Sequence, residues 1–317
     1  MSTPSSGYAV TNEQQPKREK VTAPDIRARK GGPKIKMVTA YDAPSATIAD
    51  RAGADIILVG DSLANVVLGL SDTLTVTVDE MVHHTKAVTR TRPKAHVVGD
   101  MPWLSYHLSP EEAVRNAGRF IKEGRAESVK LEGGRNRLEA IEAIIAAEIP
   151  VMGHLGLTPQ SVNAMGGYKV QGKGVEKAKQ LINDAKVLQN AGVYAIVLEG
   201  VPTLLGQLIT KEIDVPTIGI GAGPYTDGQV LVYHDLLGLH DQRVAKFVRK
   251  YANLYEASLE AVTHFFADVE AGVFPSDDEA YEMPEEAEAA LFSDEDLRNI
   301  NFGEDGTVGG ESSGGLF

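Results

Sequence analysis

Ile56-Ile57-Leu58-Val59-Gly60-Asp61-Ser62 is the stretch of sequence that decides the fold. Its four consecutive aliphatic residues predict a strand that is buried on both faces, as strands of parallel sheets are. The apolar run then ends in a small residue, a carboxylate and a hydroxyl. Parallel α/β proteins carry their chemistry at the carboxyl ends of their strands, so Asp61 and Ser62 are candidate site residues.

The same pattern recurs along the chain. Four more short apolar runs end on an ionisable residue, namely Val97-Val98-Gly99-Asp100, Val129-Lys130-Leu131-Glu132, Val151-Met152-Gly153-His154 and Ile196-Val197-Leu198-Glu199. One such ending would mean little. Five of them predict polar groups gathered around a common centre.

Apolar runs alternate with helical patterns over most of the chain. The predicted strands cover 36–41, 56–59, 96–100, 128–132, 149–154, 194–199, 217–221 and 230–235. Eight strands that alternate with helices indicate an α/β fold of the (β/α)8 TIM barrel type. An open doubly wound sheet is the alternative, but only a closed barrel brings the ends of five strands to one centre. We also expect an N-terminal helix within 22–31 and outer helices within 244–272.

Charge and composition divide the chain of 317 residues into three parts. Residues 276–317 hold 13 acidic residues and one basic residue, which accounts for almost all of the net charge of -13. We expect a flexible N-terminal arm at 1–21, a catalytic barrel domain at 22–275 and an acidic, disordered tail at 276–317.

Several classes of protein are disfavoured by the composition. The nearly neutral body argues against a nucleic-acid partner, which would require clustered Lys and Arg. No stretch is long and apolar enough for a membrane helix or a signal peptide. The chain has no cysteine, which excludes disulfides, thiolate metal sites and a cysteine nucleophile. A cytoplasmic location is therefore expected.

Three carboxylates form the first candidate site. Asp61, Asp100 and Glu132 each follow an apolar run, and if they converge, a cation is needed to offset their repulsion. Ligation by oxygen alone favours Mg²⁺ or a similar hard ion. The alternative is that each carboxylate caps the next helix. Three of them on successive strands favour a metal site.

Four further residues have two interpretations each. Lys130 shares a strand face with Glu132, and it either binds a substrate carboxylate or neutralises a neighbour. Ser62 either donates to a substrate carboxylate or caps a helix. His154, between small residues, is either structural or functional. Glu199 lies outside the carboxylate cluster, so it is free to take or give a proton, unless a lysine pairs with it.

Other patterns in the sequence are weaker evidence for a functional site. His83 and His84 fall inside a predicted helix, where packing or surface roles are more common than metal binding. Gly219-Ile-Gly-Ala-Gly223 follows the seventh strand, where barrels often bind phosphate, but it also fits a close approach by a ligand or a loop. Residues 155–174 form a Gly-rich loop that is long for a connector and is our candidate for covering the site.

Long motifs together resemble the ketopantoate hydroxymethyltransferase family. The resemblance runs from about residue 22 to 275, and it is carried by Met37–Asp42, Val59–Leu63, Val76–Met81, Val129–Gly134, Pro150–Gln160, Gly167–Gly172, Ile218–Gly223 and Asp227–Val232. Departures from the usual pattern, such as Pro224-Tyr-Thr226, lie outside the candidate site residues.

The resemblance implies a function and a set of roles. Members transfer a hydroxymethyl group from methylene-tetrahydrofolate to 3-methyl-2-oxobutanoate through a Mg-bound enolate, and they supply pantothenate and coenzyme A synthesis. It implies that Asp61 and Asp100 bind Mg²⁺ directly and that Glu132 binds it directly or through water. It also implies that Asp61, Ser62, Asp100 and Lys130 bind the ketoacid and that Glu199 is the proton acceptor. His154 would support this set from a second layer. The resemblance also implies a homo-oligomer, commonly a decamer.

Two alternative functions remain open from the sequence alone. Another Mg²⁺-dependent enolate barrel, a lyase or mutase, would be expected to carry a reactive cysteine, which this chain lacks. A catalytically inactive barrel that serves as a binding scaffold is disfavoured by the intact carboxylates and by Glu199.

Overall fold

The computed structural model describes residues 18–293. The predicted arm is therefore described only from Arg18 and the predicted tail only as far as residue 293, and the remainder of both predictions lies outside the described residues. Contacts divide the chain into a first unit that ends at Tyr255 and a second unit that begins at Glu256.

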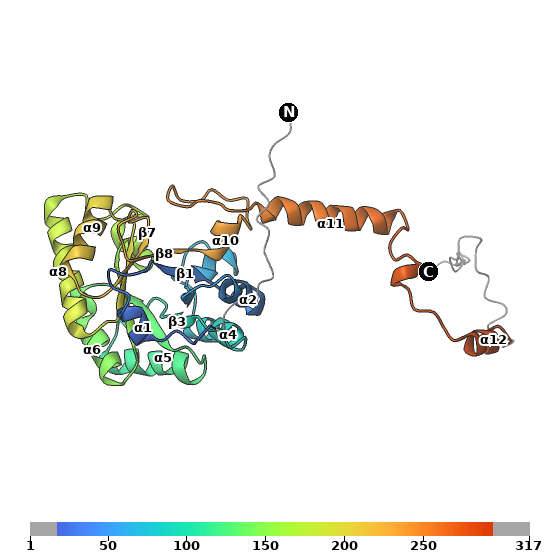
Figure 1. Cartoon of the computed structure of the whole chain (residues 1–317), viewed down its shortest axis with the longest axis horizontal. Helices are drawn as coiled ribbons and strands as arrows, with labels where there is room; N and C mark the ends of the chain where they lie inside the picture. Colours follow the sequence, from blue (N-terminus) through green and yellow to red (C-terminus); the bar gives the residue numbers. More distant parts are fainter. Residues whose placement is uncertain (1–17, 294–317) are drawn as a thin grey trace, which may run out of the picture. The chain divides into compact units, whose positions relative to one another are not determined.

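The first unit is a closed barrel of eight parallel strands joined in chain order, which confirms the predicted (β/α)8 fold (Figure 1). Strand β8 pairs with β1, with Ile35 opposite Gly228, so the sheet has no free edge. The strands are β1 (Ile35–Thr39), β2 (Ile56–Val59), β3 (His96–Asp100), β4 (Ser128–Glu132), β5 (Val151–Gly156), β6 (Ala195–Glu199), β7 (Thr217–Ile220) and β8 (Gly228–Leu231).

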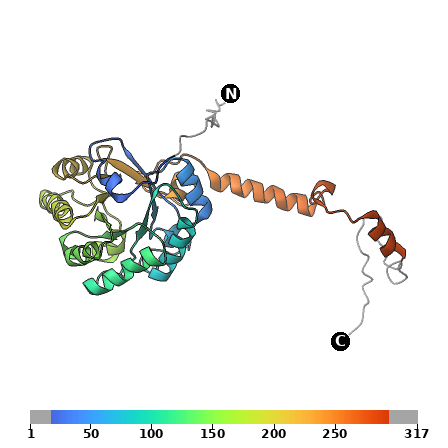
Figure 2. The same ribbon diagram turned by 60° about the horizontal axis from the view of Figure 1, so that its bottom comes forward.

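Helices surround these strands on the outside, as Figure 2 shows. The long barrel helices are α2 (Ala43–Arg51), α4 (Val78–Thr89), α5 (Pro110–Lys122), α6 (Leu138–Ala146), α8 (Val175–Ala191) and α9 (Thr203–Glu212). Shorter helical segments are α1 (Ala23–Arg27), α3 (Leu63–Val66), η1 (Arg135–Arg137), η2 (Pro159–Ser161), α7 (Val162–Met165) and α10 (Tyr233–Leu237).

Alternation along each strand produces two apolar layers. Ile57 and Val59 of β2 belong to the cluster between the strands and the helices, whereas Ile56 and Leu58 belong to the cluster inside the barrel. Successive side chains of a strand point to opposite faces. Because Val129 and Leu131 also lie in the outer cluster, the same rule places Lys130 and Glu132 inside the barrel, as predicted.

Helix caps follow the sequence signals, with one correction. Thr22 and Thr77 form capping boxes at α1 and α4, in which side chain and backbone satisfy each other's donors. Ser109-Pro-Glu-Glu112, at the start of α5, has the sequence of a capping box as well, but this box is only half formed. Ser109 accepts a bond from the backbone of Glu112 (3.2 Å), but the Glu112 side chain does not return to the Ser109 backbone.

The eighth strand was predicted at 230–235, and this range is wrong. Strand β8 is Gly228–Leu231, and residues from Tyr233 onward form α10, which ends at Gly238 in the left-handed conformation. The backbone of Tyr233 donates to the Thr39 hydroxyl (2.9 Å), which turns the chain out of the sheet. An apolar run of strand composition therefore continues into a helix without a break in pattern.

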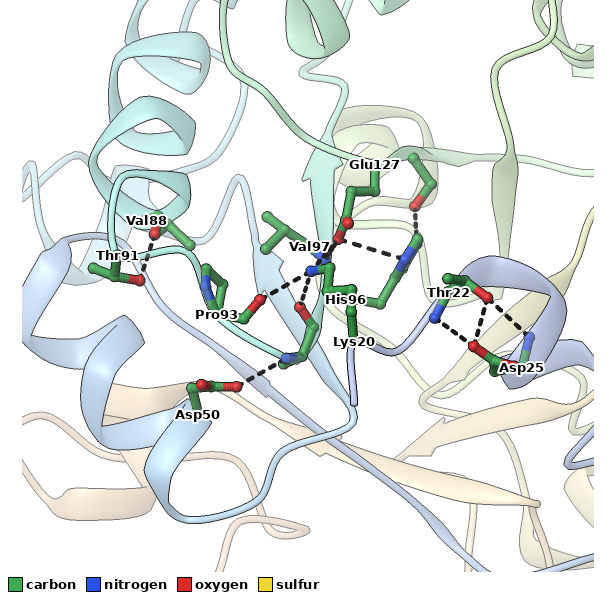
Figure 3. Close-up of polar contacts among 12 residues, drawn as sticks. Lys20, Thr22, Asp25, Asp50, Val88, Thr91, Pro93, His96, Val97 and Glu127 are labelled. Atoms are coloured by element: carbon green, nitrogen blue, oxygen red, sulfur yellow. Dashed lines mark hydrogen bonds and ion pairs between the residues drawn. The ribbon is translucent and has the colours of Figure 1, made fainter. Parts of the chain in front are cut away.

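Residues before α1 cover the amino-terminal end of the barrel (Figure 3). Lys20 donates to the carbonyls of Pro93 (3.0 Å) and Ala95 (2.7 Å), and its Nζ lies 2.7 Å from an oxygen of Glu127. Val21 and Ile26 are buried in the interior cluster. The last residues of the predicted arm thus pack on the barrel.

His96 lies at this closed end, at the start of β3 (Figure 3). Its Nε2 is 2.8 Å from the Ser128 hydroxyl, which is 2.9 Å from the Tyr194 hydroxyl. Burial, with a further contribution from Lys20, lowers the pKa of His96 to about 3. The imidazole is therefore neutral at physiological pH.

The second unit contains helices with exposed side chains. Helix α11 (Leu254–Glu270), η3 (Asp277–Glu279) and α12 (Glu285–Ser293) have no buried residue. The prediction of helix within 244–272 is confirmed for α11, whereas residues 244–253 form none. In the described part of the chain, no helix combines the length and hydrophobicity that a membrane span requires.

Candidate active site

One cavity at the carboxyl ends of the strands brings all the predicted site residues together. It has a volume of about 210 Å³, below the roughly 300–1,000 Å³ of sites for drug-sized ligands, so it suits a small molecule. The predicted residues that line it are Asp61, Ser62, Asp100, Lys130, Glu132, His154 and Glu199.

Lys130 and two aspartates form its charged floor. The Nζ of Lys130 lies 2.8 Å from an oxygen of Asp100, and the backbone of Asp61 donates to the other oxygen of Asp100 (3.0 Å). Burial raises the pKa of Asp100, and Asp61 adds to this rise, whereas the ammonium group of Lys130 opposes it and favours the charged carboxylate. Burial lowers the pKa of Lys130, but the surrounding carboxylates outweigh it and raise that pKa. Lys130 thus neutralises Asp100, one of its two predicted roles.

His154 connects two carboxylates. Its Nδ1 lies 3.5 Å from Glu132 and 3.3 Å from the Nζ of Lys130, and its Nε2 lies 3.4 Å from Glu199. Burial and Lys130 disfavour the protonated ring, but Glu132 and Glu199 outweigh them and raise the pKa of His154 to about 9. A protonated His154 therefore holds Glu132 and Glu199 in fixed positions on neighbouring sides of the cavity.

Glu199 owes its position partly to a glycine. Gly156, at the end of β5, has φ +100, and a Cβ there would collide with the carbonyl oxygen of Glu199. This backbone conformation and this close approach both require glycine. No lysine pairs with Glu199 among the ion pairs of residues 18–293, so the alternative of a simple salt bridge to lysine finds no support.

Gln160 and Tyr106 are site residues that sequence reasoning missed. The side-chain amide of Gln160 donates to Asp61 (2.9 Å), and its backbone donates to Glu132 (3.1 Å). The Tyr106 hydroxyl donates to the Gln160 carbonyl oxygen (2.5 Å) and accepts from the backbone of Glu132 (3.2 Å). A glutamine in a Gly-rich loop looks like a solvated residue, and only its place in the motif 150–160 marked it.

Ser62 does not cap a helix. It precedes α3 and makes no capping bond, and its hydroxyl lies 2.8 Å from the Tyr41 hydroxyl. Burial is the largest cause that raises the pKa of Tyr41, so this phenol stays protonated. Tyr41 thus orients the Ser62 hydroxyl at the cavity wall.

The three carboxylates are of the chemical type that binds a hard cation, but their present positions do not form a complete cation site. Among residues 18–293, no three acidic or imidazole side chains are arranged to hold a metal ion. However, none of Asp61, Asp100 and Glu132 caps the helix after its own strand. One oxygen of Glu132 is buried and makes no hydrogen bond, its contact with the Nδ1 of His154 being 3.5 Å long, and burial raises the pKa of this group. An oxygen-only donor set with an unsatisfied buried oxygen suits Mg²⁺.

The structure shows the places of the weaker sequence patterns, which are the two histidines, the glycines after β7 and the Gly-rich loop. His84 contacts the carbonyl oxygen of Tyr41 through Nδ1 (2.7 Å), and neither His83 nor His84 lines the cavity. A Cβ at Gly221 would lie 2.6 Å from the ring of Phe247. The glycines after β7 therefore admit a neighbouring segment. The predicted loop 155–174 contains η2 and α7 and supplies Pro159 and Tyr168 to the cavity wall.

Solved structures share this fold at low sequence identity. Phosphonopyruvate hydrolase matches with a TM-score of 0.54 at 13% identity, over 88% of this chain and 98% of that chain. A 2,3-dimethylmalate lyase of the PEP mutase/isocitrate lyase superfamily matches with a TM-score of 0.53 at 16% identity, over 87% of this chain and 96% of that one. At these identities, the likeness concerns the fold alone.

Several proteins of known name are much more similar in sequence to this chain than these solved structures are. A protein of Syntrophomonas wolfei named 3-methyl-2-oxobutanoate hydroxymethyltransferase is 58% identical over 259 residues, which are 82% of this chain and 94% of that protein. Proteins of the same name from Moorella thermoacetica and Koribacter versatilis are 56% and 54% identical and are covered over 98% and 93% of their lengths. The family model for ketopantoate hydroxymethyltransferase matches residues 20–277. The chain therefore belongs to the ketopantoate hydroxymethyltransferase family.

Proposed function

We propose that this enzyme transfers the one-carbon unit of methylene-tetrahydrofolate to 3-methyl-2-oxobutanoate and forms ketopantoate, for pantothenate and coenzyme A synthesis. The observation that carries the proposal is the single small cavity in which Asp61, Asp100, Lys130, Glu132 and Glu199 meet, in a chain with close relatives named for this reaction.

The residues have complementary roles in this reaction. Asp61, Asp100 and Glu132 would hold Mg²⁺, which when bound draws electron density from the keto group as a Lewis acid. Lys130 and the Ser62 hydroxyl bind the substrate carboxylate. The Tyr41 contact of 2.8 Å fixes the direction of that hydroxyl, and the buried floor excludes water around the carboxylate.

Glu199 acts as the base. It takes the proton from the carbon next to the keto group, and His154 at 3.4 Å holds its carboxylate in place. That carbon then bonds to the methylene carbon as the bond from methylene to one tetrahydrofolate nitrogen breaks. Water then replaces the second tetrahydrofolate nitrogen on the methylene carbon and supplies the hydroxyl group, and the two nitrogens take up the proton held by Glu199 and the remaining proton of water. General base catalysis by a positioned side chain contributes about 10²–10⁴-fold in rate.

An assay of ketopantoate formation from 3-methyl-2-oxobutanoate and methylene-tetrahydrofolate, with and without a chelator, tests the proposal. We expect turnover that the chelator abolishes and added Mg²⁺ restores. Absence of ketopantoate under these conditions contradicts the proposed function, and full activity in the chelator contradicts the metal role.

We also propose that the enzyme is a cytoplasmic homo-oligomer. Large apolar side chains on α11, among them Leu259, Val262 and Phe266, are exposed in the single chain, and exposed apolar patches of this kind favour contacts between proteins. Light scattering coupled to size exclusion gives the subunit number, and a monomer at micromolar concentration would contradict this proposal.

A further inference from the structure

A second hollow lies beside the active-site cavity. Its volume is about 820 Å³, and it is lined by residues of the 155–174 loop and of the start of α8. The same loop lines both hollows, because Tyr168 lines the active-site cavity and Lys169 lines the second hollow. The backbone of Gln171, which also lines the second hollow, donates to the carbonyl of Gly200 (2.8 Å), the residue after Glu199.

Three exposed lysines face this hollow and give it a net positive charge. Lys169, Lys173 and Lys177 line it, and among residues 18–293 Glu176 is the one acidic residue in its lining. Glu176 is already paired, since its oxygen lies 3.3 Å from the Nζ of Lys179. In the described part of the chain, no ion pair involves any of the three lysines. Residues 1–275 hold 31 acidic and 30 basic residues, and within this nearly neutral part of the chain the three lysines form an unneutralised cationic site.

The start of α8 adds to the positive potential. Gly174 occupies the N-cap position without a side-chain cap, so the first backbone N–H groups of this 17-residue helix lack a side-chain acceptor. The positive end of a helix dipole disfavours a lysine in the first turn, where Lys177 lies. An anion in the hollow would satisfy the helix end and the lysines together.

We propose that this lysine hollow (Lys169, Lys173 and Lys177) binds the γ-linked polyglutamate tail of a folate co-substrate. The inference rests on the proposed function, because that function places the pterin at the mouth of the active-site cavity. The tail then lies on the far side of Tyr168 and presents a row of carboxylates to a row of ammonium groups. The lining contains no arginine, the residue whose planar fork matches phosphate, so a carboxylate chain fits the hollow better than a phosphate.

The test compares the KM for methylene-tetrahydrofolate carrying one glutamate with the KM for the same folate carrying five. We expect the pentaglutamate KM to be lower by about tenfold at low salt, and the difference to shrink as ionic strength rises, because the lysines are exposed and screened. The variant Lys169→Gln/Lys173→Gln/Lys177→Gln should remove the difference and leave kcat and the monoglutamate KM unchanged.

A matched control carries the same change of charge elsewhere. The variant Lys94→Gln/Lys122→Gln/Lys211→Gln alters three exposed lysines outside the hollow, and it should keep the wild-type difference. Thermal melting of both variants verifies folding, and direct binding of a penta-γ-glutamate peptide, measured calorimetrically, gives a readout that does not depend on turnover.

The outcomes separate this inference from the proposed function. Turnover of the monoglutamate tests the function alone. Equal KM values for the two folates in the wild-type enzyme, or a preference that persists in the hollow variant, would overturn the inference while the function stands. Displacement of the peptide by pyrophosphate at much lower concentration than by free peptide would also overturn it, since the site would then be one for phosphate.

Discussion

Replacement of Gln160 by leucine tests how the carboxylates are held. The variant Gln160→Leu keeps the approximate size of the side chain and the backbone bond to Glu132. It removes the bonds from the amide to Asp61 (2.9 Å) and to the Met101 carbonyl (3.0 Å), and it leaves the buried Tyr106 hydroxyl without its acceptor at 2.5 Å.

The expected effect follows from these contacts. A hydrogen bond to a charged group contributes about 1.5–3 kcal/mol, which corresponds to roughly a 10–150-fold change in an equilibrium constant. Loss of an outer partner of a metal ligand typically weakens metal affinity or activity by about 10–100-fold. We therefore expect the Mg²⁺ concentration for half-maximal ketopantoate formation to rise by one to two orders of magnitude in Gln160→Leu.

The assay is a Mg²⁺ titration of initial rates, accompanied by calorimetry of 3-methyl-2-oxobutanoate binding. The control is Gln171→Leu, in the same loop. Within residues 18–293, its side-chain amide donates to the Lys169 carbonyl (2.8 Å) and to no carboxylate, so this variant should behave as wild type. A Gln160→Leu enzyme that is folded and has an unchanged Mg²⁺ requirement would refute the idea that Gln160 positions Asp61.

Three further predictions concern the proposed base, the proposed metal ligands and the buried histidine His96. Glu199→Gln should retain ketoacid binding and lose at least about 100-fold in turnover, and near-normal turnover in a stopped assay would remove Glu199 as the base. Asp61→Asn combined with Asp100→Asn should abolish Mg²⁺-dependent ketoacid binding in calorimetry, and unchanged binding would discredit the metal site. His96 has a folded pKa of about 3, below its unfolded value of about 6.5, so the unfolded chain takes up the proton first as pH falls. Its contribution to the free energy of unfolding should therefore be complete above pH 6.5 and decline by roughly 2 kcal/mol at pH 5, a loss that urea titrations should show in wild type and not in His96→Gln.

The periodic pattern of apolar residues was sufficient to predict the barrel and the set of polar side chains at the carboxyl ends of its strands. Strand runs that end on Asp61, Asp100, Glu132, His154 and Glu199 all deliver these side chains to one cavity, because parallel strands in a closed barrel share one polar end. These positions follow from alternation along a strand, which is a local property of the sequence.

The other features of the fold and the site were not predicted, because they depend on contacts between segments that are distant in the sequence. Gln160 reaches Asp61, 99 positions earlier in the chain, and Tyr41 reaches Ser62 from another strand end, and no local pattern encodes either contact. The end of β8 was misplaced for a similar reason, since the bond from Tyr233 to Thr39 spans 194 positions. Tertiary hydrogen bonds decided these details, and intrinsic propensity did not.

The closed amino-terminal end of the barrel has a kinetic consequence. Val21 and Ile26 are buried there, and His96, Ser128 and Tyr194 bond to one another across the interior. Under the proposed function, both reactants enter from the open carboxyl end of the barrel, with the small acid on the floor of the cavity and the bulky folate above it. Steady-state rates should follow a compulsory order, in which the acid enters first and its hydroxymethylated form departs last, after the spent carrier has gone.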